Sequence, residues 1–110
     1  MSDEVVLRDT EDSDGVRYLD ASLNSDGKLM VTGHDLGSGV SKIFGKDLDE
    51  YEWIFTIDSE QFPILIKELG GNVGDNVINL IRKKCTGTKA IDLEEVIREK
   101  VPHDFWSWIP

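Results

Sequence analysis

The sequence predicts an α+β domain in which an antiparallel β-sheet is packed on one face by about three C-terminal helices. Apolar and polar residues alternate through much of the first half of the 110-residue chain, as in strands with one solvated face. In the second half the apolar residues recur at helical spacing. Because the strands come first and the helices afterwards, we expect a sheet of about three to five antiparallel strands rather than a parallel one.

The segment 51–69 carries the clearest pattern, a strand that runs directly into a helix. Aromatic and β-branched side chains alternate along its first part, which favours a strand. The residues expected on the buried face are Tyr51, Trp53, Phe55 and Ile57. Asp58 and Gln61 have the spacing of a helix cap, and Pro63 is tolerated only in a first turn, so the helix begins there. Gly70 ends it, because glycine accepts the left-handed conformation.

The start of the chain is acidic. Residues 1–14 hold six acidic residues and one arginine, and we expect a flexible segment with only a weak edge strand at 5–8. A single domain then covers 15–110. The start lacks the basic and apolar regions of a signal peptide, and no run approaches the ~20 apolar residues of a membrane span. We therefore expect a cytosolic protein.

A hairpin follows the acidic start. Alternation over 16–23 predicts a strand, and the residues at 24–27 are those of a tight turn. The return strand is predicted at 29–32. The glycine-rich segment 33–39 is then expected to bend the chain sharply away from the edge of the sheet.

The segment Gly33–Gly39 also raises two chemical alternatives. Its three glycines do not follow the order of known phosphate-binding loops. The adjacent His34 and Asp35 suggest an enzyme, but a catalytic histidine also needs a nucleophile and an oxyanion site. Ser38 and Ser41 lack the pattern of a nucleophile elbow. We expect a protein that is not an enzyme, and an enzyme using His34 stays as an alternative.

Two further helices are predicted, over about residues 75–85 and from Asp92 onward, with Glu94 on the solvated side of the second. Cys85 is the one cysteine, which excludes an internal disulfide and a cysteine-based zinc site, and we expect it to be buried. The aromatic tail 103–110 would be an aggregation hazard if exposed. We therefore expect it to lie buried on the core as a short extended segment.

The formal net charge is −10, and it is unevenly placed. Residues 1–60 hold 15 acidic and 5 basic residues, whereas residues 61–110 hold 7 of each. Such a field repels nucleic acid and acidic membranes and steers a basic partner toward the sheet. Solubility is the simpler explanation of the same acidity. We expect no cofactor, no metal, and no nucleic-acid or membrane partner.

Short motifs along residues 16–108 resemble those of a group of small acidic bacterial proteins. They are the turn Asp26-Gly27, the G-x-D-L-G segment Gly33–Gly37, the Y-E-W segment Tyr51–Trp53, the helix from Pro63 to Leu69-Gly70, and Phe105-Trp106. Some proteins of this kind resemble immunity proteins of bacterial toxin systems, including contact-dependent growth inhibition. The resemblance implies a cytosolic monomer that forms a one-to-one complex with a basic toxin domain, often a nuclease. It does not identify the binding residues.

Charge suggests the binding residues. An inhibitor that displaces RNA or DNA from a nuclease needs carboxylates for the enzyme's Lys, Arg and His side chains. We expect the acidic cluster Asp47, Asp49 and Glu50 to bind the toxin, with Asp20, Asp35 and Glu52 in support and Tyr51 as an aromatic anchor. The cluster lacks the spacing of an EF-hand calcium loop. A non-catalytic adaptor with a different partner is the alternative function.

Overall fold

Four strands, three α-helices and a final strand follow one another in the part of the chain that the structure describes, which confirms the α+β class. The computed structural model describes residues 4–13, 15–37 and 50–108. The elements are β1 (Glu4–Asp12), β2 (Gly15–Leu23), β3 (Leu29–Leu36), β4 (Glu50–Ile57), the 3-10 helix η1 (Ser59–Gln61), α2 (Phe62–Glu68), α3 (Val77–Lys84), α4 (Leu93–Lys100) and β5 (Asp104–Trp108).

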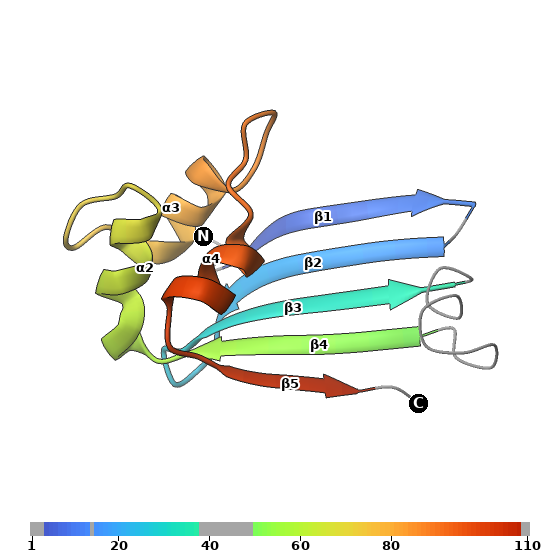
Figure 1. Cartoon of the computed structure of the whole chain (residues 1–110), viewed down its shortest axis with the longest axis horizontal. Coiled ribbons are helices and arrows are strands. Elements are labelled where there is room, and N and C mark those ends of the chain that lie inside the picture. The colour runs from blue at the N-terminus through green and yellow to red at the C-terminus, as the bar shows by residue number, and fades with distance from the viewer. Residues whose placement is uncertain (1–3, 14, 38–49, 109–110) are drawn as a thin grey trace.

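The strands form one antiparallel sheet in the order β1-β2-β3-β4-β5 (Figure 1). The helices are inserted between β4 and β5, so the C-terminal strand returns to the sheet after them and pairs with β4 at the edge. Strand β4 lies inside the sheet between two neighbours, and β3 is the middle strand.

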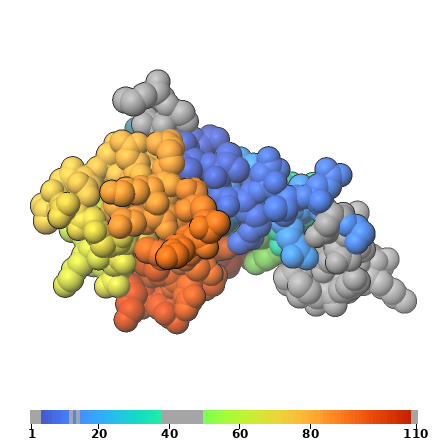
Figure 2. Space-filling model, turned by 90° about the horizontal axis from the view of Figure 1, so that it is seen from above, coloured from blue at the N-terminus to red at the C-terminus, as the bar shows by residue number. Residues whose placement is uncertain are grey.

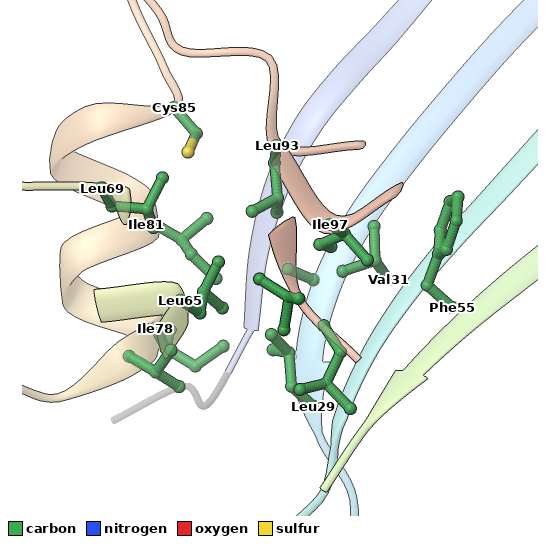
Figure 3. Packing of buried hydrophobic residues seen from close by; sticks show 14 of the residues in the cluster. Leu29, Val31, Phe55, Leu65, Leu69, Ile78, Ile81, Cys85, Leu93 and Ile97 are labelled. Atoms are coloured by element: carbon green, nitrogen blue, oxygen red, sulfur yellow. The ribbon is translucent and has the colours of Figure 1, made fainter. Parts of the chain in front are cut away.

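One face of the sheet packs against the helices, and the hydrophobic core lies between them. The buried apolar residues on this face are Val5, Leu19, Ala21, Leu29, Val31, Trp53, Phe55 and Ile57. The buried residues of the helical layer are Leu65, Ile66, Leu69, Val77, Ile78, Leu80, Ile81, Cys85, Leu93, Ile97 and Val101. Figure 3 shows Leu65 and Ile78 facing the strand residue Leu29, while Ile97 lies close to Val31. Removal of these apolar surfaces from water holds the two layers together.

Helices α3 and α4 begin at local caps, α4 at Asp92 as its sequence predicts and α3 at Asn76, just after the predicted start at about residue 75. The side chains of Asn76 and Asp92 each accept a hydrogen bond from the backbone N–H three residues later, at the start of α3 and α4. Asp58 differs from the prediction. It precedes η1 without a side-chain cap, and its carboxylate lies 3.1 Å from Nζ of Lys28 at the hairpin turn. Asp58 therefore ties the start of η1 to the neighbouring hairpin.

Strand β1 corrects one expectation. We expected residues 1–14 to be flexible with a weak edge strand at 5–8, whereas Glu4–Asp12 pairs with β2 and the register shifts once along it. Arg82 Nη2 in α3 also donates a hydrogen bond to the carbonyl of Glu4 at 2.9 Å. The acidic composition suggested disorder, but the ladder to an adjacent strand satisfies the backbone whatever the side chains are.

Strand β3 is longer than the strand predicted at 29–32. We expected the glycines of 33–39 to turn the chain, but Gly33 continues the strand. The ring of Trp53 lies over it, since a Cβ at Gly33 would be 2.0 Å from Trp53 Cζ2. A glycine in a strand permits this close approach of an aromatic ring. The change of direction comes later, at Gly37, where φ is +111°.

The aromatic tail forms an edge strand, as we expected for 103–110, but it is not buried. Phe105, Trp106 and Trp108 are 50%, 49% and 43% exposed. Phe105 contacts the core residue Phe55 with ring centroids 5.0 Å apart, yet half of its own surface stays exposed. The prediction of burial was wrong because two of these aromatic side chains, Trp106 and Trp108, lie on the face of the sheet opposite the core, and hydrophobicity alone does not show which face a side chain occupies.

The helices cover one end of the strands. In Figure 1 they gather at one end of the sheet, and in Figure 2 the blue strands β1 and β2 extend past the yellow and orange helical layer. None of the described helices is long and apolar enough to cross a membrane.

Candidate protein-binding surface

The face of the sheet opposite the helices, called here the open face, carries the candidate site. The strand registers assign to it Glu4, Val6, Asp9, Glu11, Val16, Tyr18, Asp20, Ser22, Met30, Thr32, His34, Leu36, Glu50, Glu52, Ile54, Thr56, Asp104, Trp106 and Trp108. None of these residues is fully buried. No described helix packs on this face, since the buried residues of the strands all lie on the other one.

Negative charge dominates the open face. Its carboxylates are Glu4, Asp9, Glu11, Asp20, Glu50, Glu52 and Asp104, and none of its described residues is Lys or Arg. The two arginines of the strands lie on the opposite face, because Arg8 pairs with Leu19 and Arg17 pairs with Asp35. The open face therefore carries part of the uneven charge noted in the sequence, without basic side chains among its described residues to offset it.

The strand registers align the open face into rows across all five strands. One row runs through Asp9, Tyr18, His34, Glu52 and Trp108, and the next through Val6, Asp20, Thr32, Ile54 and Trp106. Cross-strand neighbours have Cβ atoms about 4.5–5.5 Å apart, so each row is a continuous line of contacting side chains. Both rows end in a half-exposed tryptophan at the β5 edge.

Asp20 sits within this surface beside Tyr18. Tyr18 Oη donates a hydrogen bond to Asp20 Oδ2 at 3.1 Å. Partial burial raises the pKa of the Asp20 carboxyl, and the hydrogen bond from Tyr18 lowers it by less. Burial, followed by the bond to Asp20, also raises the pKa of the Tyr18 hydroxyl. Tyr18 thus holds the Asp20 carboxylate in place, and this carboxylate can accept further hydrogen bonds.

His34 pairs with Glu50 and not with Asp35. Its Nε2 lies 2.8 Å from Glu50 Oε1. Successive side chains of a strand point to opposite faces, so His34 lies on the open face and Asp35 on the helical face. The catalytic pair considered from the sequence, in which Asp35 would orient His34, is therefore not formed.

The predicted binding residues are divided by the fold. Asp20, Glu50 and Glu52 lie together on the open face, while Asp35 and Tyr51 face the helical side and pair directly with each other. Of the expected cluster, Asp47 and Asp49 lie outside the described residues. Tyr51 stacks on Trp53, with ring centroids 5.1 Å apart. The set predicted as one patch thus belongs to two surfaces in the described chain.

Glu94 of α4 is buried, although we expected it to be solvated. Its Oε2 accepts a hydrogen bond from Trp53 Nε1 at 2.8 Å, and its Oε1 lies 3.4 Å from Arg8 Nη2. The carboxylate therefore joins α4 to β4 and β1 on the helical face. Helical periodicity does not reveal this role, because it depends on a tryptophan and an arginine far away in the sequence.

The thiol of Cys85 is buried in the hydrophobic core. Burial raises the pKa of the Cys85 thiol to about 11, so the thiol stays protonated near neutral pH and is a poor nucleophile. Within residues 4–13, 15–37 and 50–108, no three or more His, Cys, Asp or Glu side chains are grouped so as to hold a metal ion.

Trp106 and Trp108 of β5 were not among the binding residues suggested by the sequence. We expected the tail to be buried, but Trp106 and Trp108 end two rows of the open face with nearly half of their surface exposed. The alternation in the tail was the signal, because it separates Trp106 and Trp108 from Phe105.

No protein-family model matches the chain, and neither does any curated protein or solved structure with which it was compared. Function is therefore inferred from the residues of the open face and their arrangement.

Proposed function

We propose that the protein is a cytoplasmic immunity protein that binds a cognate basic toxin domain, a nuclease, and blocks its active site with an acidic surface. One observation carries the proposal. The open face presents seven carboxylates and, among its described residues, no Lys or Arg. A surface of this kind suits a basic partner and repels nucleic acid.

The chemistry of a nuclease explains why carboxylates serve as an inhibitor. A nuclease binds its polyanionic substrate with Lys, Arg and His side chains, and carboxylates form charge-assisted hydrogen bonds with the same groups. Asp20 of β2 and Glu50 and Glu52 of β4 place three carboxylates on one side of the sheet, on the two strands that flank β3. Opposite fields also accelerate association, which an inhibitor needs in order to act before the toxin does damage.

A non-catalytic adaptor is the second candidate. The half-exposed Trp106 and Trp108 favour it, because exposed aromatic side chains are common in protein interfaces of every kind. Under this alternative the partner is not a toxin, and the carboxylates of the open face favour a partner with a basic surface.

The test is a pull-down from the bacterium that makes the protein, followed by calorimetric titration of the captured partner. We expect a tight complex with a basic nuclease-like domain whose activity is lost in the complex. The triple change Asp20→Asn, Glu50→Gln and Glu52→Gln should weaken the complex by about tenfold or more, at roughly 1.5 kcal/mol or more for the lost charged hydrogen bonds.

The matched control neutralises three exposed carboxylates of the helical side, Glu60→Gln, Glu68→Gln and Glu99→Gln, and so changes the net charge by the same amount. We expect the control to bind nearly as tightly as the wild type. Equal weakening by both triple variants would show that only net charge matters, and a captured partner that is acidic or has no toxic activity would exclude the immunity function.

A further inference from the structure

We propose that the Trp106–Trp108 edge of the open face recognises arginine side chains of the basic partner, with guanidinium groups stacked on the two indoles and paired with neighbouring carboxylates. The inference rests on the proposed function, since it names the chemistry by which the same surface selects its partner. The recognition surface consists of Trp106, Trp108, Glu52 and Ile54, and is called here the tryptophan edge.

The register places aromatic and acidic groups side by side. Trp108 is the direct cross-strand neighbour of Glu52, and Trp106 is the neighbour of Ile54. A guanidinium over the indole of Trp108 is therefore within reach of the Glu52 carboxylate. The two tryptophans are two residues apart on one strand, about 7 Å, so an extended segment with arginine at every second position matches their spacing.

The exposure of Trp106 and Trp108 favours a role in binding. Phe105, on the other face of β5, contacts Phe55, whereas Trp106 and Trp108 remain 49% and 43% exposed. Large exposed aromatic side chains that adjoin one another mark interaction sites more often than single exposed apolar residues do. Tryptophan is also among the residues that contribute most to binding energy when an interface covers them.

Two partners could cover the tryptophan edge, a second copy of this chain or a basic protein, and charge favours the basic protein. A second copy of the chain would bring Glu52, Asp104 and their neighbours against the same groups of a protein with net charge −10, which is repulsive. A basic partner removes this cost. Arginine fits better than lysine, because its planar guanidinium stacks on an aromatic face while its N–H groups fork toward a carboxylate.

The direct test uses two synthetic peptides of equal length, one alternating Arg with Thr and the other Lys with Thr. Each is titrated into the full chain while the indole N–H signals are followed by NMR. We expect the arginine peptide to bind about fivefold tighter than the lysine peptide. The signals of Trp106 and Trp108 should shift, while Trp53, whose N–H is held by Glu94, serves as an internal reference. An equal affinity for the two peptides, or shifts confined to Trp53, would overturn the inference.

Variants provide an independent measurement. Trp106→Thr with Trp108→Thr keeps strand-favouring residues in β5 and should abolish the preference for arginine, whereas Phe105→Thr on the opposite face should retain it. The captured toxin domain separates the two proposals. If it binds the double variant as tightly as the wild type, the tryptophan edge is not the recognition site although the immunity function stands. If no toxin is captured but the peptides behave as expected, the immunity function fails and arginine recognition remains.

Discussion

Glu94 illustrates how one buried carboxylate connects three elements. It accepts a hydrogen bond from the indole of Trp53 at 2.8 Å and lies 3.4 Å from the guanidinium of Arg8. Gly33 is part of the same arrangement, because only a residue without a side chain leaves room for the Trp53 ring. These contacts fix the position of α4 over β1, β3 and β4.

Replacement of Glu94 by Ala should therefore lower the free energy of unfolding by about 2 kcal/mol, because it leaves the N–H of Trp53 without its acceptor inside the protein. Urea denaturation followed by circular dichroism measures the change. The neighbouring Glu95→Ala is the control, since the Glu95 side chain is exposed. Unfolding free energies within about 0.5 kcal/mol for the two variants would contradict the role given to Glu94.

Asp35 makes stability depend on pH in the opposite sense to an ordinary salt-bridged acid. Burial raises the pKa of its carboxyl, more than Arg8 and Arg17 lower it. The folded state therefore holds the proton more strongly than the unfolded state, whose value is near 3.8. The stabilising contribution is fully present below that value and is lost as the pH rises through the folded pKa.

We accordingly expect Asp35→Asn to be more stable than the wild type at neutral pH, and the difference to shrink as the pH falls below about 4. Urea titrations of both proteins between about pH 3 and pH 7 check this. A variant that is less stable than the wild type at neutral pH would mean that attraction to the arginines outweighs the cost of burial.

At the scale of elements, β5 contributes backbone pairing and exposed side chains more than hydrophobic core. It pairs with β4 through five cross-strand positions, yet each of its residues is exposed. Side chains of β5 that lie on the open face can therefore be substituted while the backbone hydrogen bonds to β4 are preserved.

Trp108→Thr should therefore change the free energy of unfolding by less than about 1 kcal/mol, whereas Phe55→Ala in the adjacent strand should cost about 3–5 kcal/mol, because Phe55 is 1% exposed. Thermal and urea unfolding of both variants measure the difference. A large loss of stability in Trp108→Thr would assign the tryptophan a structural role and weaken the case for a binding one.

At the scale of the whole molecule, the excess negative charge lies with the sheet more than with the helices. The acidic first half of the chain supplies four of the five described strands, and the neutral second half supplies the α-helices and β5. An open face of one sign has a directional field, so the proposed basic partner would be attracted to one side of the sheet.

The association rate with the captured basic domain should therefore fall steeply with salt. We expect a decrease of about tenfold or more between low and near-physiological ionic strength, with a much smaller change in the dissociation rate. Stopped-flow fluorescence of the tryptophans measures both rates. An association rate that does not respond to salt would show that the open face does not steer the partner.

Local pattern in the sequence was enough to predict the α+β class, the hairpin turn, the start of α4 and the buried side of β4. These features depend on alternation, helical spacing, turn residues and caps, all of which act over a few neighbouring residues. The same reasoning picked out Asp20, Glu50 and Glu52, because acidity is visible in composition, but it also included Asp35 and Tyr51, which lie on the other face.

Only the tertiary structure decided which side chains share a surface. The strand pairing places Glu52 beside Trp108 and Gly33 beneath the ring of Trp53. It also makes the acidic start of the chain a strand, β1. The pairing of β5 with β4 placed Trp106 and Trp108 on the face opposite the helices and so left them exposed. Each of these outcomes depends on contacts between residues distant in the chain, whose energies local spacing does not contain.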